Sequence, residues 1–213
     1  MKTSIYTLSL FTLLAHAQIG NANQLQETLT ATADTIIRKD RQFQNYGVTR
    51  HIAVTNDSAK NARVALVQFD TADILTTKYT QTLFRMYILD VNIDVYRVSD
   101  SDSEDGEISV LIRRVNSNFD EDRVTWSNYY VDYGDVNNDE SEDSIEFRVM
   151  SEHVGKIGQV DVSNLMVPGE NLNLAIYTSD GGHIKMASRE HENPAAHPQL
   201  LILEEQLKWR DDL

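Results

Sequence analysis

The feature that most constrains this chain is a series of short β-rich segments, separated by clusters of Asn, Asp, Gly and Ser. Helical periodicity is almost absent after residue 32. Many short strands with turn signals between them are typical of a sandwich or barrel. We therefore predict an all-β fold, an antiparallel β-sandwich of the jelly-roll type. The strands that we expect span residues 34–38, 51–55, 63–69, 83–98 with a bulge, 108–115, 123–126, 145–150, 159–162, 171–178, 184–187 and 199–204.

The strand at residues 63–69 carries apolar residues at both odd and even positions. Successive side chains of a strand point to opposite faces of the sheet. We therefore expect both faces of this strand to be covered. By contrast, residues 171–177 alternate as a half-buried strand does.

The start of the chain has the pattern of an export signal. Lys2 precedes a mostly apolar run over residues 5–15, and Ala15-His16-Ala17 offers a small-x-small cleavage pattern. The alternative is an ordinary buried segment. We predict a cleaved signal peptide over 1–17, a linker over 18–28, one β-sandwich domain over 29–204 and a tail over 205–213, in a secreted, extracellular protein.

Charge and composition exclude several functions. The formal net charge is −14, and a field of this sign repels nucleic acid and anionic membrane surfaces. No later apolar run is long enough for a membrane helix. The absence of cysteine excludes metal sites built on thiolates. Because no nucleophile elbow or catalytic triad motif is present, we predict that the chain is not an enzyme.

An ordered set of short motifs resembles one family of secreted sandwich modules. The resemblance covers roughly residues 29–204, nearly all of the predicted mature chain. The motifs are residues 32–38, Asn45-Tyr46-Gly47, 63–70, Phe119, Glu121, Thr125, Trp126, Asn128, 160–162, 172–177, Ala187-Ser188-Arg189-Glu190 and 198–202. In this order they resemble carbohydrate-binding module family 96, also described as DNRLRE-type domains.

The resemblance implies a jelly-roll-like sandwich that binds polysaccharide, the best-known ligand of the family being the acidic polysaccharide alginate. Phe119 stands where the family pattern has its first Trp. Trp126 is interpreted as a core anchor, the alternative being a platform on which a sugar ring stacks. The Ser-Arg-Glu pattern reads as structural, with Arg189 and Glu190 bracing one another or a neighbouring loop.

Loop tyrosines and a group of arginines are the candidate sugar contacts. Tyrosines beside Gly or Asn in loops suit stacking, and arginines can pair with the carboxylates of a uronate polymer. The alternative for the basic residues is a solvated strand face with local salt bridges. The candidate ligand-binding residues are Arg38, Arg41, Tyr46, Arg50, Tyr129, Tyr130 and Tyr133.

An acidic stretch at residues 135–146 has oxygen ligands at the spacing of a calcium loop. The candidate ligands are Asp135, Asn137, Asp139, Asp143 and Glu146. Position 6 of this loop is Glu140 rather than the expected Gly, and no helices flank it. A solvated run of like charge is the alternative. We predict no other cofactor.

Two functions from different classes follow. The first is a secreted, non-catalytic module that binds a polysaccharide of the uronate type. The second is a structural or adhesive extracellular protein whose acidic loops bind calcium or protein partners and which does not bind sugar. The sequence does not predict the oligomeric state.

Overall fold

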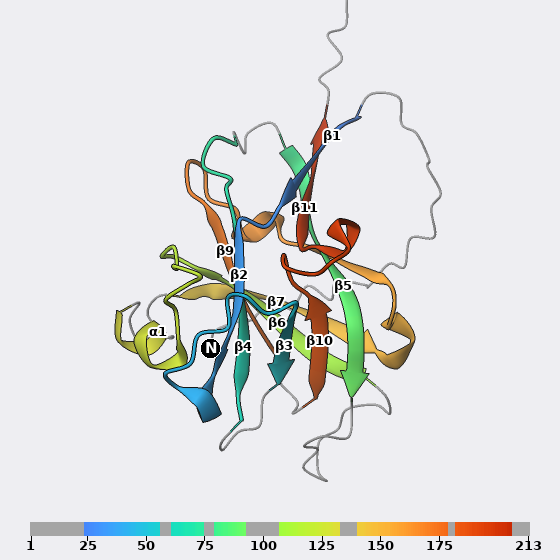
Figure 1. Ribbon diagram of the computed structural model, residues 1–213. Helices are drawn as coiled ribbons and strands as arrows, with labels where there is room; N and C mark the ends of the chain where they lie inside the picture. The colour runs from blue at the N-terminus through green and yellow to red at the C-terminus, as the bar shows by residue number, and fades with distance from the viewer. Residues whose placement is uncertain are drawn as a thin grey trace, which may run out of the picture.

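The computed structural model describes residues 24–55, 61–74, 79–92, 107–132, 140–178 and 182–205. Eleven strands of this part of the chain form one curled antiparallel sheet (Figure 1). The strands are β1 (Gln24–Thr30), β2 (Ala33–Arg38), β3 (His51–Thr55), β4 (Arg63–Phe69), β5 (Tyr79–Asn92), β6 (Glu107–Val115), β7 (Glu140–Met150), β8 (Ile157–Asp161), β9 (Leu172–Thr178), β10 (His183–Ala187) and β11 (Gln199–Glu205).

The sheet folds back on itself into two layers. One layer has the order β2-β4-β9-β6-β7, and the other has β3-β10-β5-β11-β1 with β8 on the second edge of β5. A single residue pair, Thr55 with Arg63, joins β3 to β4 at the corner. The long strand β5 pairs with β11 through its first half and with β10 near its end. The all-β sandwich predicted from the sequence is therefore confirmed.

The main core lies between these layers because each contributes its apolar inward face. Phe69 of β4 and Phe84 of β5 meet across the interface in an edge-to-face arrangement, with ring centroids 6.0 Å apart. Such aromatic pairs add stability beyond the area that they bury. Isoleucines and valines of β3, β6, β9 and β10 also belong to this core between the two layers. A core of this size can stabilise the fold without disulfides.

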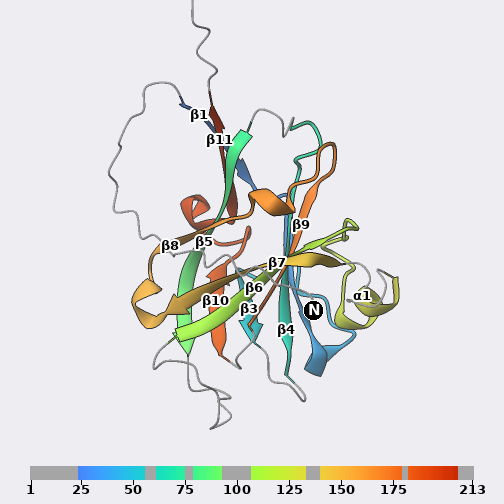
Figure 2. The ribbon, with the colours of Figure 1, turned by 180° about the vertical axis from the view of Figure 1, so that it is seen from behind.

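A second, smaller core lies on the outer face of β2, β4 and β9. Ile37, Leu66 and Ala175 point to this side and are covered by Phe119, Val124 and Tyr129. The covering segment includes a short helix, α1 (Trp126–Asp132), which lies beside β2 and β4 in both views (Figures 1 and 2). Both faces of β4 are buried, as its sequence predicts.

Two expectations for local structure are wrong. Residues 123–126 are not a strand: a turn ends at Arg123, and Trp126 opens α1. Residues 24–28, expected within a linker, belong to β1, which pairs along its whole length with β11. Backbone pairing with β11 stabilises this polar stretch as a strand. The proposed signal segment lies outside the described residues.

Short 3-10 turns connect several strands. They are η1 (Lys39–Arg41), η3 (Ser151–His153), η4 (Ser163–Leu165) and η5 (Pro194–Ala196). No helix among the described residues is long and apolar enough to cross a membrane.

Candidate functional site

Motifs that are distant in sequence meet beside the free edge of β2. The Asn45 side-chain amide donates to the carbonyls of Glu121 and Val124, at 2.6 and 2.9 Å. Gly47 lies so close to Glu121 that a Cβ at this position would be 2.5 Å from its carbonyl oxygen. Two features therefore hold the loops at residues 42–50 and 119–125 against each other. They are the hydrogen bonds of the Asn45 side chain and the absence of a Cβ at Gly47.

Arg189 ties this junction to the loop that follows β10. Its backbone N–H donates to Asp34 Oδ2 at 2.6 Å, and its Nη2 donates to Glu121 Oε2 at 3.0 Å. Its Nε donates to Glu190 Oε1 at 3.2 Å, and its Nη1 to the carbonyl of Thr32. The predicted bracing of Arg189 and Glu190 is therefore confirmed, and it extends to β2 and to the 119–125 loop.

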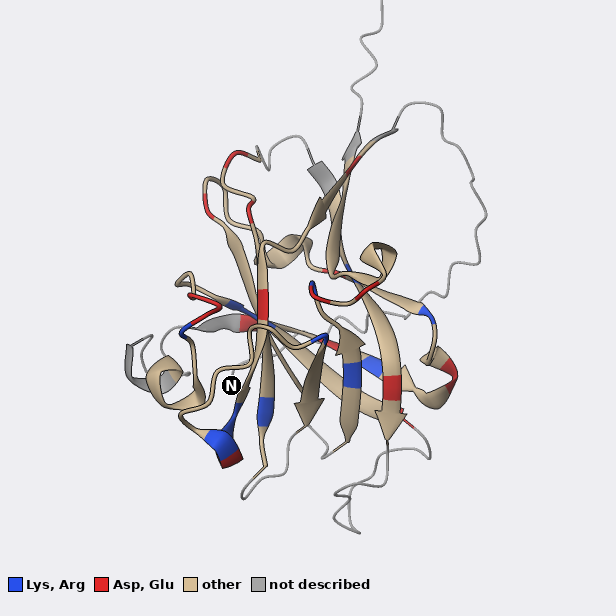
Figure 3. Ribbon diagram, viewed as in Figure 1, with Lys and Arg blue, Asp and Glu red and all other residues tan. Residues whose placement is uncertain are grey.

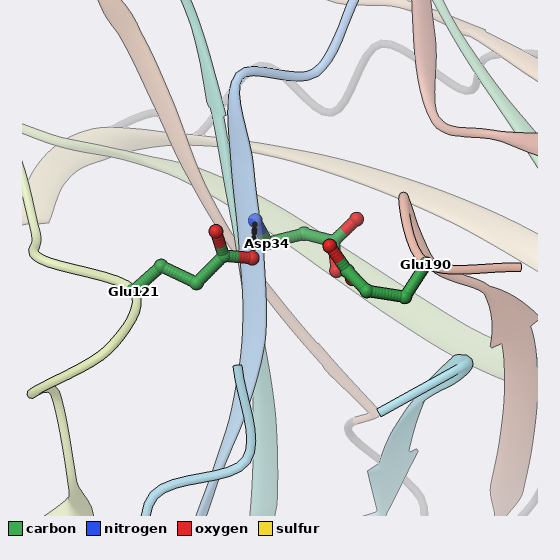
Figure 4. Close-up of side chains that lie close together, drawn as sticks. All are labelled: Asp34, Glu121 and Glu190. Atoms are coloured by element: carbon green, nitrogen blue, oxygen red, sulfur yellow. Dashed lines mark hydrogen bonds between the residues drawn. The ribbon is translucent and has the colours of Figure 1, made fainter. Parts of the chain in front are cut away.

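Three carboxylates gather around the same point. One oxygen each of Asp34, Glu121 and Glu190 lies within 4.8 Å of the others (Figure 4). Glu121 Oε1 accepts the backbone N–H of Asp34 at 3.0 Å. This bond covers an N–H at the exposed edge of β2, whose described strand pairing is with β4. Figure 4 shows the carboxyl groups of Asp34 and Glu190 facing each other.

The electrostatics of this carboxylate cluster are unfavourable. Asp34 is only 1% exposed, and burial raises its pKa to about 8, against the opposing effect of the Arg189 amide. Burial also raises the pKa of Glu121. Asp34 Oδ1 and Glu190 Oε2 are buried and accept no hydrogen bond. A buried carboxylate oxygen without a donor is costly to keep as part of an anion, so burial favours the protonated form of Asp34 at neutral pH.

The loop after β2 presents a different kind of surface. Phe43 is 83% exposed and lies beside a shallow, open hollow of about 580 Å³ that residues 39–44 line. Lys39 and Arg41 supply positive charge to this hollow, and Gln42 and Gln44 supply amides. Figure 3 shows basic and acidic residues adjacent on η1, at the end of β2. The exposed ring, two cations and two amides therefore lie together on this loop.

The predicted basic residues separate into two groups. The guanidinium of Arg38 pairs with Asp40 at 2.6 Å and lies 5.4 Å from the ring centre of Tyr46. This hydrogen bond lowers the pKa of Asp40. Arg38 therefore has the predicted alternative role, a local salt bridge, and Tyr46 packs partly against the core. Arg41 and Arg50 are exposed, and Arg41 lines the hollow.

Of the predicted tyrosines, the structure describes the side chains of Tyr46 and Tyr129. Tyr129 is 1% exposed and belongs to the second core, a position that does not favour the predicted contact with sugar. The side chain of Tyr130, in α1, and all of Tyr133 lie outside the described residues. Trp126 is half-buried against the second core, as predicted for an anchor. Phe119, which replaces the family's first Trp, is 6% exposed and is also a core residue.

The predicted calcium loop is only partly described. Asp135, Asn137 and Asp139 lie outside the described residues, whereas Asp143 and Glu146 lie in β7 and are exposed. Two strand residues three positions apart point to opposite faces. Glu146 accepts a hydrogen bond from Ser109 of β6. The second half of the segment is therefore an extended strand and does not wrap around one ion as an EF-hand loop does.

These observations define a class first. The molecule is an antiparallel β-sandwich with a surface aromatic residue beside cations and amides. Within this class, the family model for carbohydrate-binding module family 96 matches residues 25–204. The chain therefore belongs to carbohydrate-binding module family 96. A comparison with curated proteins gave no significant match.

Membership agrees with the prediction that the chain is not an enzyme, because carbohydrate-binding modules are non-catalytic. It also identifies carbohydrate as the class of ligand.

Two features of the site escaped the sequence analysis. Phe43 stands between two glutamines in a predicted loop, and that polar setting was the available signal for an exposed ring. The carboxylate cluster joins residues 34, 121 and 190, and only the folded topology shows their proximity.

Proposed function

We propose that this chain is a secreted, non-catalytic module that binds a polysaccharide, with Phe43 as the ring on which a sugar stacks. The exposure of Phe43 carries the proposal. Leaving a phenyl ring in water is unfavourable, whereas the flat apolar face of a sugar ring can cover it. The open shape of the hollow suits a chain that passes over the surface rather than a small molecule that is enclosed.

The charges beside Phe43 favour an acidic polysaccharide of the uronate type. Lys39 and Arg41 line the hollow together with one acid, Asp40, which is paired with Arg38. Arginine binds carboxylates through paired N–H groups. The local charge at the hollow is thus opposite to the net charge of −14. Export rests on the signal pattern of residues 1–17.

The test is affinity electrophoresis of the full chain in gels that contain a polyuronate, a neutral glucan or no polysaccharide. We expect retardation by the polyuronate that is lost in Phe43→Ala. Val48→Ala is the matched control, because Val48 is an apolar residue of the same loop that is 80% exposed and does not line the hollow. Equal retardation of Phe43→Ala and wild type would refute the stacking role, and no retardation by any polysaccharide would favour the adhesive alternative.

A second variant tests the charge preference. Arg41→Gln keeps a polar side chain and removes the cation. We expect it to weaken binding to the polyuronate several-fold and to leave any binding to neutral glucan unchanged, because only the former provides carboxylates. The polyuronate affinity of wild type should also fall with added salt. An equal loss for both polysaccharides would contradict a uronate preference.

A further inference from the structure

The carboxylate cluster of Asp34, Glu121 and Glu190 shows two features of a cation site. The first is geometric: one oxygen of each residue lies within 4.8 Å of the others. Calcium binds oxygen ligands at about 2.3–2.6 Å, so two ligands of one ion can be about 5 Å apart. The three oxygens therefore fit within one coordination sphere without movement of the backbone.

The second feature is that two buried carboxylate oxygens of the cluster have no hydrogen-bond donor. Asp34 is 1% exposed, yet its Oδ1 accepts no hydrogen bond, and neither does the buried Oε2 of Glu190. Buried polar atoms almost always have partners, and exceptions require a reason such as an ion. Figure 4 shows these two carboxyl groups pointing toward each other. Two carboxylates in this arrangement repel unless a proton or a cation lies between them.

Arg189 leaves this position open. Its guanidinium donates to Glu121 Oε2, to Glu190 Oε1 and to the carbonyl of Thr32. None of these bonds uses Asp34 Oδ1 or Glu190 Oε2. One guanidinium also does not balance three ionised carboxylates, so in the absence of a cation burial holds a proton on Asp34 at neutral pH.

We infer that Asp34, Glu121 and Glu190 bind a divalent cation of the calcium type. Hard oxygen ligands without nitrogen or sulfur favour calcium over zinc. The side chains of Glu121 and Glu190 are 14% and 25% exposed, which gives the ion access to the buried Asp34. The ion would link β2, the 119–125 loop and the loop after β10. It would thereby stabilise the segments against which the loop that carries Phe43 packs.

The test is thermal unfolding of the full chain after treatment with a chelator, with calcium chloride added back. Magnesium chloride and sodium chloride at equal ionic strength are the salt controls. We expect calcium at about 100-fold above its dissociation constant to raise the Tm by roughly 5–10 °C, since only the folded chain holds the three ligands together. Calorimetry should give one ion per chain for this site.

Two variants locate the ion. Asp34→Asn and Glu190→Gln keep the size of each side chain and should weaken calcium binding by about 10-fold or more. Asp139→Asn, in the acidic segment at residues 135–146, is the matched control and should retain the wild-type response. Glu190 is the less buried of the two ligands, so its variant serves if Asp34→Asn does not fold.

The outcomes distinguish the alternatives. A wild-type Tm that calcium does not change would overturn the inference and favour a proton shared by Asp34 and Glu190. A calcium response that persists in Glu190→Gln and disappears in Asp139→Asn would also overturn it and place the ion in the acidic segment.

Discussion

Gly47 shows how one residue fixes two loops at the scale of single atoms. A Cβ at this position would be 2.5 Å from the carbonyl oxygen of Glu121 and 2.7 Å from its Cγ. The first of these atoms belongs to the backbone and cannot rotate away. Glycine is therefore required here by close approach rather than by an unusual backbone conformation.

We predict that Gly47→Ala lowers the free energy of unfolding by about 1–3 kcal/mol, because the loops must separate to admit the methyl group. Chemical denaturation monitored by fluorescence measures the change. Gln44→Ala, at an exposed position in the same loop, should change it by less than about 0.5 kcal/mol. A Gly47→Ala protein as stable as wild type would show that the contact between the loops is looser than described.

His153 makes a pH-dependent contribution to stability. Its side chain is 4% exposed, and its Nδ1 accepts the backbone N–H of Met150 at 2.9 Å. Burial lowers its pKa below 6.5. The folded chain therefore binds fewer protons at this site than the unfolded chain does. The contribution is fully present above pH 6.5 and is lost as the pH falls through the folded-state pKa.

We predict that His153→Asn is less sensitive to acid than wild type, because the asparagine oxygen can accept the Met150 N–H at any pH. Urea denaturation at several values between about pH 7 and pH 5 measures this. The carboxylates titrate in both proteins. The difference between their free energies of unfolding at each pH therefore reports the contribution of His153 alone. Parallel pH profiles would show that this histidine does not titrate differently on folding.

At the scale of elements, α1 and the loop before it form a cover over the outer face of one layer. Val124, at 0% exposure, and Tyr129, at 1%, seal this face together with Phe119. The cover explains why β4 is apolar on both sides. It also explains why Phe119 and Tyr129 belong to a core.

We predict that Tyr129→Ala lowers the free energy of unfolding by about 3–5 kcal/mol, in the range for a large side chain removed from a core. Polysaccharide affinity of the folded fraction should stay within about two-fold of wild type, since a buried ring does not contact the ligand. Thermal unfolding and affinity electrophoresis together measure both effects. Lost binding at unchanged stability would restore Tyr129 as a sugar contact.

The same elements show what the sequence could predict. Alternating patterns in β4 and β9 specify strands because burial of one or both faces is a local property of the pattern. Residues 123–126 have strand-forming composition, yet they lead from a turn into α1, and Val124 packs on the outer face of the sheet. Tyr129 and Phe43 both follow polar residues in the sequence. Only the path of the chain over that face decides that one is buried and the other exposed.

At the scale of the whole molecule, the sandwich separates stability from recognition. The two layers bury their apolar faces around Phe69 and Phe84. The hollow beside Phe43 lies at one end of β2, and the carboxylate cluster at the other end joins three segments. The family match over residues 25–204 includes all of these features. In the proposed function, recognition would depend on a loop that a rigid scaffold supports.

The central claim is that this module binds a polysaccharide through Phe43. Isothermal titration of the full chain with soluble polyuronate oligosaccharides tests it most directly. Wild type, Phe43→Ala and Val48→Ala are compared after thermal unfolding has shown that all three have the same Tm. We predict measurable binding for wild type and Val48→Ala, and an affinity at least about 10-fold lower for Phe43→Ala. Wild-type affinity in a folded Phe43→Ala protein would contradict the account.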